Sequence, residues 1–186
     1  MSKPKTFAHV VLQTRKIDEM ISWYQAVMEF DVRFRHPVMA FLCFDEEHHR
    51  IALINLMAID PEGARELSAQ MGTLEHVAFT YASAKELLNN YERLKKMGKL
   101  PFWSVHHGMT LSLYYQDPDG NRVECQVEAY ADAEQANAFL ATEVFMKNPI
   151  GVTFDPEVLL EKMRKGASEA ELLTYTPGPM AMPPHV

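Results

Sequence analysis

Two histidines and one glutamate carry the chemistry that this sequence suggests. Residues 75–79 repeat the pattern of residues 8–12 at an offset of 67, so His9 and His76 occupy the same position in two similar apolar strands. Glu124 lies on a third strand, on the face opposite its aliphatic neighbours. A single buried histidine more often satisfies a local hydrogen bond, but the repeat brings two imidazoles to equivalent places. Two imidazoles and one carboxylate are a ligand set of non-haem Fe(II) sites that leave coordination positions open.

A hairpin positions Glu124. Residues 111–115 alternate as a half-buried strand does, and Asp-Pro-Asp-Gly at 117–120 follows as a turn, because Pro pre-sets φ and Gly accepts a positive φ. The returning strand begins at Asn121. The turn therefore places Glu124 on a strand paired with the one before it.

The hairpin belongs to a repeated unit. In the first copy, a strand at 6–13 precedes an amphipathic helix, whose apolar residues are Ile17, Met20, Ile21, Tyr24, Val27 and Met28. Strands follow at 30–35, 38–44 and 50–56, and a connecting helix is expected at 61–71 with Asp60 as its cap. The second copy has a strand at 75–79, an apolar helical stripe from Ala84 to Met97, and strands at 102–105, 109–116 and 121–127.

These copies predict an α+β fold. Two βαβββ modules, about 5–58 and 73–128, would form one curved, mainly antiparallel sheet with helices outside, in a single domain spanning 1–130. Residues 131–186 are expected to form a C-terminal extension with helices at 133–145 and 156–165. Its Pro-rich end, 174–186, is expected to be extended or disordered.

Composition narrows the function classes. The 186 residues carry a net charge of -7 and scattered Lys and Arg, which argues against nucleic acid or an anionic membrane as partner. Cys43 and Cys125 match no disulfide or zinc pattern, and no apolar run approaches the roughly 18 residues of a membrane span. We therefore expect a cytoplasmic protein.

The repeated unit, the two strand-borne histidines and the Asp-Pro-Asp-Gly-Asn-Arg-Val-Glu block at 117–124 resemble the vicinal oxygen chelate (glyoxalase/bleomycin resistance/dioxygenase) superfamily. Within it, the chain resembles one-domain type I extradiol dioxygenases that open catechols and 2,3-dihydroxybiphenyl. The resemblance covers about residues 6–128. It implies a metal at His9, His76 and Glu124, namely Fe(II), with Mn(II) as the alternative.

Two further stretches carry the resemblance to the dioxygenases. His-His-Arg-Ile-Ala-Leu at 48–53 resembles the strand on which the second histidine acts as acid and base, which implies this role for His49. From the residues alone, this pair could also be exposed at the entry of a strand. His-Gly-Met-Thr at 107–110 with Tyr114 resembles the His and Tyr beside the metal, although the shortened hairpin leaves His106 as an alternative to His107.

Position 52 separates the dioxygenases from glyoxalase-like relatives. Those relatives have a fourth ligand, a Glu, where this chain has Ala52. The resemblance thus implies ring cleavage of an aromatic diol by O2, in a homo-oligomer. Two alternatives stay open: a metal-dependent isomerase, epimerase or fosfomycin-transferase-like enzyme that uses no oxygen, and a metal-free ligand-binding or resistance module.

Overall fold

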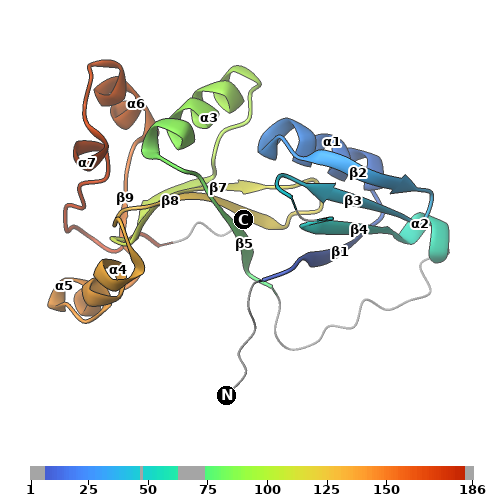
Figure 1. Cartoon of the computed structure of the whole chain (residues 1–186), viewed down its shortest axis with the longest axis horizontal. Helices are drawn as coiled ribbons and strands as arrows, with labels where there is room; N and C mark the ends of the chain where they lie inside the picture. Colours follow the sequence, from blue (N-terminus) through green and yellow to red (C-terminus); the bar gives the residue numbers. More distant parts are fainter. Residues whose placement is uncertain (1–6, 47, 63–73, 183–186) are drawn as a thin grey trace. The chain divides into compact units, whose positions relative to one another are not determined.

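The computed structural model describes residues 7–46, 48–62 and 74–182 (Figure 1). They form two units, each with its own sheet. The first unit comprises Met1–Leu74 with Asp117–Asn121, and the second comprises Glu75–Gln116 with Arg122–Val186.

The first unit contains a four-stranded mixed sheet in the order β1-β4-β3-β2. Only β1 and β4 run parallel; the β2–β3 and β3–β4 pairs are antiparallel. The elements are β1 (Val10–Thr14), α1 (Ile17–Met28), β2 (Asp31–His36), β3 (Met39–Cys43), β4 (Ile51–Asn55) and α2 (Leu56–Ile59).

Helix α1 buries the stripe that its periodicity predicts. Met20, Tyr24 and Val27 are almost fully buried, as are Leu42 and Leu53 of the sheet. Burial of apolar side chains against a sheet is the main favourable term that holds such a layer together. Asp18 and Glu19 in the first turn also complement the helix dipole.

The second unit repeats this plan and extends it. Its five-stranded sheet has the order β5-β8-β7-β6-β9, again with one parallel pair, β5 and β8. The elements are β5 (His76–Thr80), α3 (Ala84–Lys96), β6 (Trp103–His106), β7 (Thr110–Gln116), β8 (Arg122–Glu128), α4 (Ala133–Leu140), α5 (Glu143–Lys147), β9 (Val152–Thr153), α6 (Pro156–Arg164) and α7 (Glu169–Leu172).

One face of the second sheet is packed and the other carries polar side chains. Helix α3 contacts β8, and Val123, Cys125 and Val127 are buried. Leu87 and Leu94 of α3 are fully buried as well. Glu124 therefore lies on the opposite face, as the alternation along the strand predicts.

The predicted α+β class and the two βαβββ copies are confirmed, with several corrections in detail. Strand β1 begins at Val10, so His9 precedes the strand, and Asp60 is the C-cap of α2. The expected helix at 61–71 lies outside the described residues from 63 onward. Met97 lies beyond the end of α3 and is 49% exposed.

The extension contains more structure than its pattern predicts. The helix expected at 133–145 is two helices, because the hydroxyl of Thr142 accepts a hydrogen bond from the backbone N–H of Phe145 and starts α5. Strand β9 pairs with β6 through Val105–Thr153 and His106–Val152. Residues 174–182 form no helix or strand, yet Ala181 is buried and its N–H donates to the carbonyl of Gly151.

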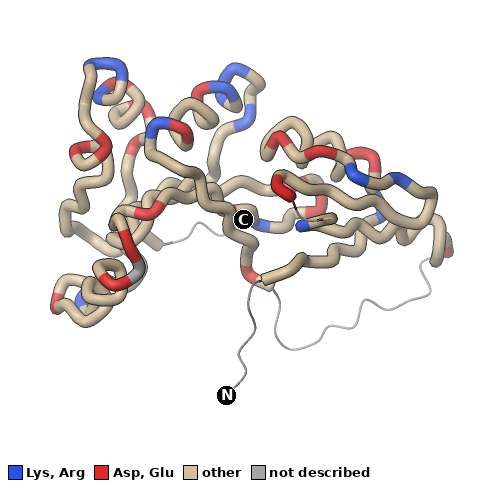
Figure 2. Tube along the Cα trace, in the orientation of Figure 1, with Lys and Arg blue, Asp and Glu red and all other residues tan. Residues whose placement is uncertain are grey.

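Charged residues of both signs occur in both units. In Figure 2, both units contain Lys and Arg as well as Asp and Glu, although the charged residues within helix α1 are acidic only. Among the described residues, no helix combines the length and the apolar character that crossing a membrane requires.

Candidate active site

The second unit brings four of the six expected site residues together. His76 is the first residue of β5, Glu124 lies in β8, Tyr114 lies in β7 and His107 follows β6. Tyr114 and Glu124 are directly opposite each other in the β7–β8 ladder, and residues opposite each other in a ladder project to the same face. The cluster therefore follows from strand pairing.

His76 and Glu124 form the centre of this cluster. Nε2 of His76 lies 3.0 Å from Oε2 of Glu124, whose side chain is only 6% exposed. The hydrogen bond to Glu124 is the main reason that the pKa of His76 is raised to about 9. Burial alone would raise the pKa of Glu124, but hydrogen bonds from His76, Ser112 and Tyr114 hold it below its ordinary value. Without a metal, His76 therefore carries the proton at neutral pH and Glu124 is ionised.

A neighbouring carboxylate orients the His76 ring. Nδ1 of His76 donates to Glu75, which also accepts a hydrogen bond from Arg122. Nε2 is left to face Glu124. Sequence reasoning missed Glu75, although its place directly before a candidate ligand is a usable signal, because histidine ligands usually donate their second N–H to a carboxylate or carbonyl.

This donor set fits a metal ion. Two ligand atoms that each lie about 2.1 Å from one ion at a right angle are about 3.0 Å apart. Nε2 of His76 and Oε2 of Glu124 are 3.0 Å apart, so the distance of their hydrogen bond is also one that two ligands of one ion can have. A divalent cation would replace the proton on Nε2 of His76, at a place that already favours positive charge. Among the described residues, no group of three or more His, Cys, Asp and Glu side chains is gathered so that it could hold a metal. His9 belongs to the first unit, so the three-ligand set stays a prediction.

His107 and Tyr114 lie beside this pair. Nε2 of His107 is 3.0 Å from the hydroxyl of Tyr114 and 3.9 Å from Oε1 of Glu124. Burial lowers the pKa of His107, whereas burial and the Glu124 carboxylate raise the pKa of Tyr114. At neutral pH the imidazole is therefore a neutral base and the phenol keeps its proton.

The neighbouring His106 is occupied elsewhere. Its Nε2–H donates to the carbonyl of Leu173, and its Nδ1 accepts the N–H of Gly108. Both ring nitrogens are thus bonded to backbone, and the side chain is 5% exposed. This geometry favours His107 over His106 as the histidine of the site, as expected from the glycine that follows it.

The first unit brings the other two expected residues together. The rings of His9 and His49 have centroids 4.3 Å apart, and His49 stacks on Phe41 at 4.3 Å with an interplanar angle of 11°. His49 is buried, whereas His48 is exposed, so the pair is not simply an exposed turn. Nδ1 of His48 lies 2.5 Å from Nδ1 of His49, which makes one nitrogen the donor and the other the acceptor.

Aromatic side chains border the cluster in the second unit. Trp103 is opposite Tyr114 in the β6–β7 ladder, with ring centroids 4.9 Å apart. Its indole nitrogen is buried and has no hydrogen-bond partner among the described residues. Phe102 lies 6.3 Å from Tyr114 between ring centroids. The site of the second unit thus has a flat apolar border next to its polar centre.

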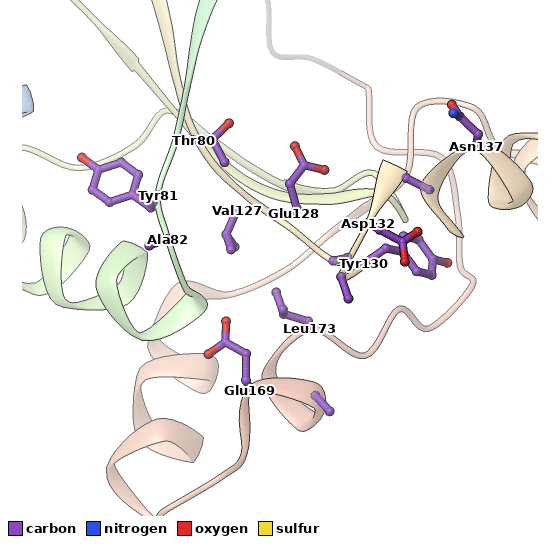
Figure 3. A pocket seen from close by; sticks show the side chains of 14 residues that line it. Thr80, Tyr81, Ala82, Val127, Glu128, Tyr130, Asp132, Asn137, Glu169 and Leu173 are labelled. Atoms are coloured by element: carbon purple, nitrogen blue, oxygen red, sulfur yellow. The ribbon is translucent and has the colours of Figure 1, made fainter. Parts of the chain in front are cut away.

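The second unit also has a hollow of about 870 Å³ near the ends of β5 and β8 (Figure 3). Its labelled side chains include three carboxylates, Glu128, Asp132 and Glu169. None of the six expected site residues lines it.

Comparisons with known proteins identify relatives. The family model described as Glyoxalase/Bleomycin resistance protein/Dioxygenase superfamily matches residues 6–125. Biphenyl-2,3-diol 1,2-dioxygenase 2 of Rhodococcus globerulus is 36% identical over 175 residues, which are 94% of this chain and 90% of that protein. Biphenyl-2,3-diol 1,2-dioxygenase 3 of the same organism is 39% identical over 176 residues, again 94% and 90%.

A solved structure shows the same fold. The glyoxylase/bleomycin resistance protein/dioxygenase domain from Frankia sp. EAN1pec superposes with a TM-score of 0.55 at 20% identity. The match covers 72% of this chain and 98% of that domain.

Proposed function

This chain belongs to the Glyoxalase/Bleomycin resistance protein/Dioxygenase superfamily, and within it we propose that the chain is an extradiol dioxygenase that cleaves the ring of a catechol-type diol with O2. The observation that carries the proposal is its homology to two biphenyl-2,3-diol 1,2-dioxygenases over 94% of its length. A cytoplasmic location and assembly into a homo-oligomer stay predictions.

In the proposed enzyme, His9, His76 and Glu124 hold the metal, with Fe(II) favoured over Mn(II). Two imidazoles and one carboxylate leave positions for both hydroxyls of a diol and for O2. Bound there, Fe(II) supplies Lewis acidity toward the diol and redox chemistry with O2. The 3.0 Å separation between His76 and Glu124 supports this assignment.

His107 and Tyr114 would handle the proton of the diol. The neutral imidazole of His107 can accept a proton, and the hydroxyl of Tyr114, 3.0 Å away, can accept the proton of the diol while it passes its own to Nε2 of His107. Because both side chains are largely buried, water competes little for these positions. Their role is to orient one diol oxygen and to move one proton.

His49 would act as the acid and base that handles the proton on the oxygen side of the reaction. It is buried and stacked on Phe41, so its ring orientation is restricted. Its ring lies beside His9, a proposed ligand. A buried histidine with a fixed orientation is suited to proton transfer, because a general acid or base must first lie within hydrogen-bond distance of the atom that exchanges the proton.

The test is oxygen consumption by the full chain, purified without air and analysed for iron. With biphenyl-2,3-diol or catechol, we expect one O2 consumed per diol and a yellow ring-opened product. Iron-loaded protein that consumes no O2 with a panel of diols would contradict the proposal and favour a non-oxidative enzyme of the same superfamily.

A further inference from the structure

The C-terminal extension makes direct contact with the candidate active site. The backbone carbonyl of Ile150 accepts a hydrogen bond from Nδ1 of His107, with 2.5 Å between nitrogen and oxygen. A carbonyl can only accept, so Nδ1 must carry the proton. In the neutral ring, Nε2 is then unprotonated and faces the hydroxyl of Tyr114.

Asn148 holds this carbonyl in place. Its side-chain Oδ1 accepts the N–H of Gly151 at 2.8 Å, and its Nδ2 donates to the carbonyl of Gly151 at 2.8 Å. Nδ2 also donates to the carbonyl of Gly178 at 3.3 Å. The Asn148 side chain is buried, with 9% of its surface exposed. Its amide thus binds both the N–H and the carbonyl of Gly151, the residue after Ile150. Breaking them would leave buried polar groups unpaired.

Gly151 lets the two backbones approach each other. Its φ is +107°, and an added Cβ would lie 2.3 Å from the carbonyl oxygen of His106 and 2.7 Å from Cα of His107. Both are backbone atoms, which cannot rotate away as a side-chain tip can. The Ile150–Gly151 peptide can therefore lie against His107 only while residue 151 has no side chain.

The extension also packs on the other side of the same turn. Gly108 has a φ of +87°, and a Cβ there would overlap the ring of Phe139 in α4. His106 donates to the carbonyl of Leu173 at the end of α7. The turn at 106–108 is thus held by α4, by the segment after α5 and by the end of α7.

We propose that Asn148 is a positioning residue of the active site, which acts through the Ile150 carbonyl to keep His107 in the tautomer whose Nε2 accepts a proton. The effect of Asn148 on turnover rests on the proposed dioxygenase function. Its effect on the tautomer of His107 does not depend on that function. The extension then acts on the active site through one backbone carbonyl, that of Ile150.

The first test is the tautomer of His107 in the metal-free full chain labelled with 15N-histidine. Its signals are identified by their absence from His107→Gln. We expect protonated Nδ1 and unprotonated Nε2 in the wild type, and a mixture of tautomers in Asn148→Ala. A wild type with the proton on Nε2, or a variant with an unchanged tautomer, would overturn the proposal.

The second test is a double-mutant cycle in ring cleavage. Asn148→Ala should lower kcat about tenfold with KM changed about twofold or less, because misplacing a catalytic group affects the chemical step more than binding. If Asn148 acts through His107, adding Asn148→Ala to His107→Gln should cause no further loss. Independent, multiplicative losses would refute the assignment.

Thr142→Ala is the matched control. Thr142 lies in the same extension and also makes two hydrogen bonds. Its hydroxyl donates to the carbonyl of Phe139 and accepts from the N–H of Phe145. It should keep the wild-type tautomer and kcat, and a loss equal to that of Asn148→Ala would overturn the proposal, because any loosening of the extension would then have the same effect.

Gly151→Ala, if it folds, should change the tautomer as Asn148→Ala does. A wild type without ring cleavage would contradict the proposed function, while the tautomer experiment would still decide this inference.

Discussion

Ala52 in β4 holds the register position that Glu124 holds in β8. Ala52 pairs with Val11 of β1 and Phe41 of β3, and Glu124 pairs in the same way with β5 and β7. The two sheets are thus built on one plan, and at this position the first sheet has a methyl group where the second has a carboxylate. Since a methyl group cannot bind a metal, the proposed iron site has three protein ligands rather than four.

Ala52→Glu should leave the proposed iron site with two open positions, one fewer than the diol and O2 need together. Iron content should stay at about one per chain, while ring cleavage falls by a factor on the order of 100, because a fourth carboxylate takes a position that the diol or O2 needs. Metal analysis and oxygen uptake measure the two effects. Ala52→Gln has nearly the same volume without the charge, and an equal loss of iron-loaded activity in both variants would point to steric blocking instead.

His49→Phe should separate metal binding from turnover. Iron content and substrate KM should change little, whereas kcat should fall about 10²- to 10⁴-fold, the usual contribution of a general acid or base. His36→Phe at the exposed end of β2 is the control and should keep wild-type turnover. Normal kcat in His49→Phe would show that the resemblance of residues 48–53 to the dioxygenase strand has no catalytic meaning.

The His76–Glu124 pair should give the metal-free chain a defined pH dependence of stability. The pKa of His76 is raised from 6.5 to about 9, mainly by the hydrogen bond to Glu124, so its stabilisation is complete below pH 6.5 and is lost as pH rises through about 9. Comparison of the melting temperatures of wild type and His76→Gln should therefore show a difference near pH 6.5 that disappears by about pH 10. A difference that grows above pH 9 would contradict this sign.

Sequence patterns predicted the fold where a periodic apolar face is long enough to be recognised. Helices α1 and α3 bury the stripes that their spacing indicates, and the eight strands that the pattern predicts correspond to β1 to β8, within a few residues of their expected bounds. Strand β9 has only two residues, which is too short for an alternating hydrophobic pattern. It forms because the edge of β6 is free to pair with it. The break between α4 and α5 left one signal, the capping Thr142, but apolar residues continue across it.

The candidate site could be predicted in part for similar reasons. The repeat placed His76 and Glu124 in facing strands, and parallel pairing of β5 with β8 brings them within hydrogen-bond distance. The contribution of Ile150 could not be predicted, because a backbone carbonyl is common to every residue and its direction depends on tertiary packing. The Asn-Pro-Ile-Gly stretch at 148–151 predicts only a turn.

The central claim is that His9, His76 and Glu124 bind one iron ion. The most direct measurement is an anomalous difference map at the iron edge, from crystals grown without air and loaded with Fe(II). We predict a single peak per chain, about 2.0–2.3 Å from one nitrogen of each histidine and one oxygen of Glu124. A peak bound by other residues, or no peak in an iron-loaded and catalytically active chain, would contradict the account.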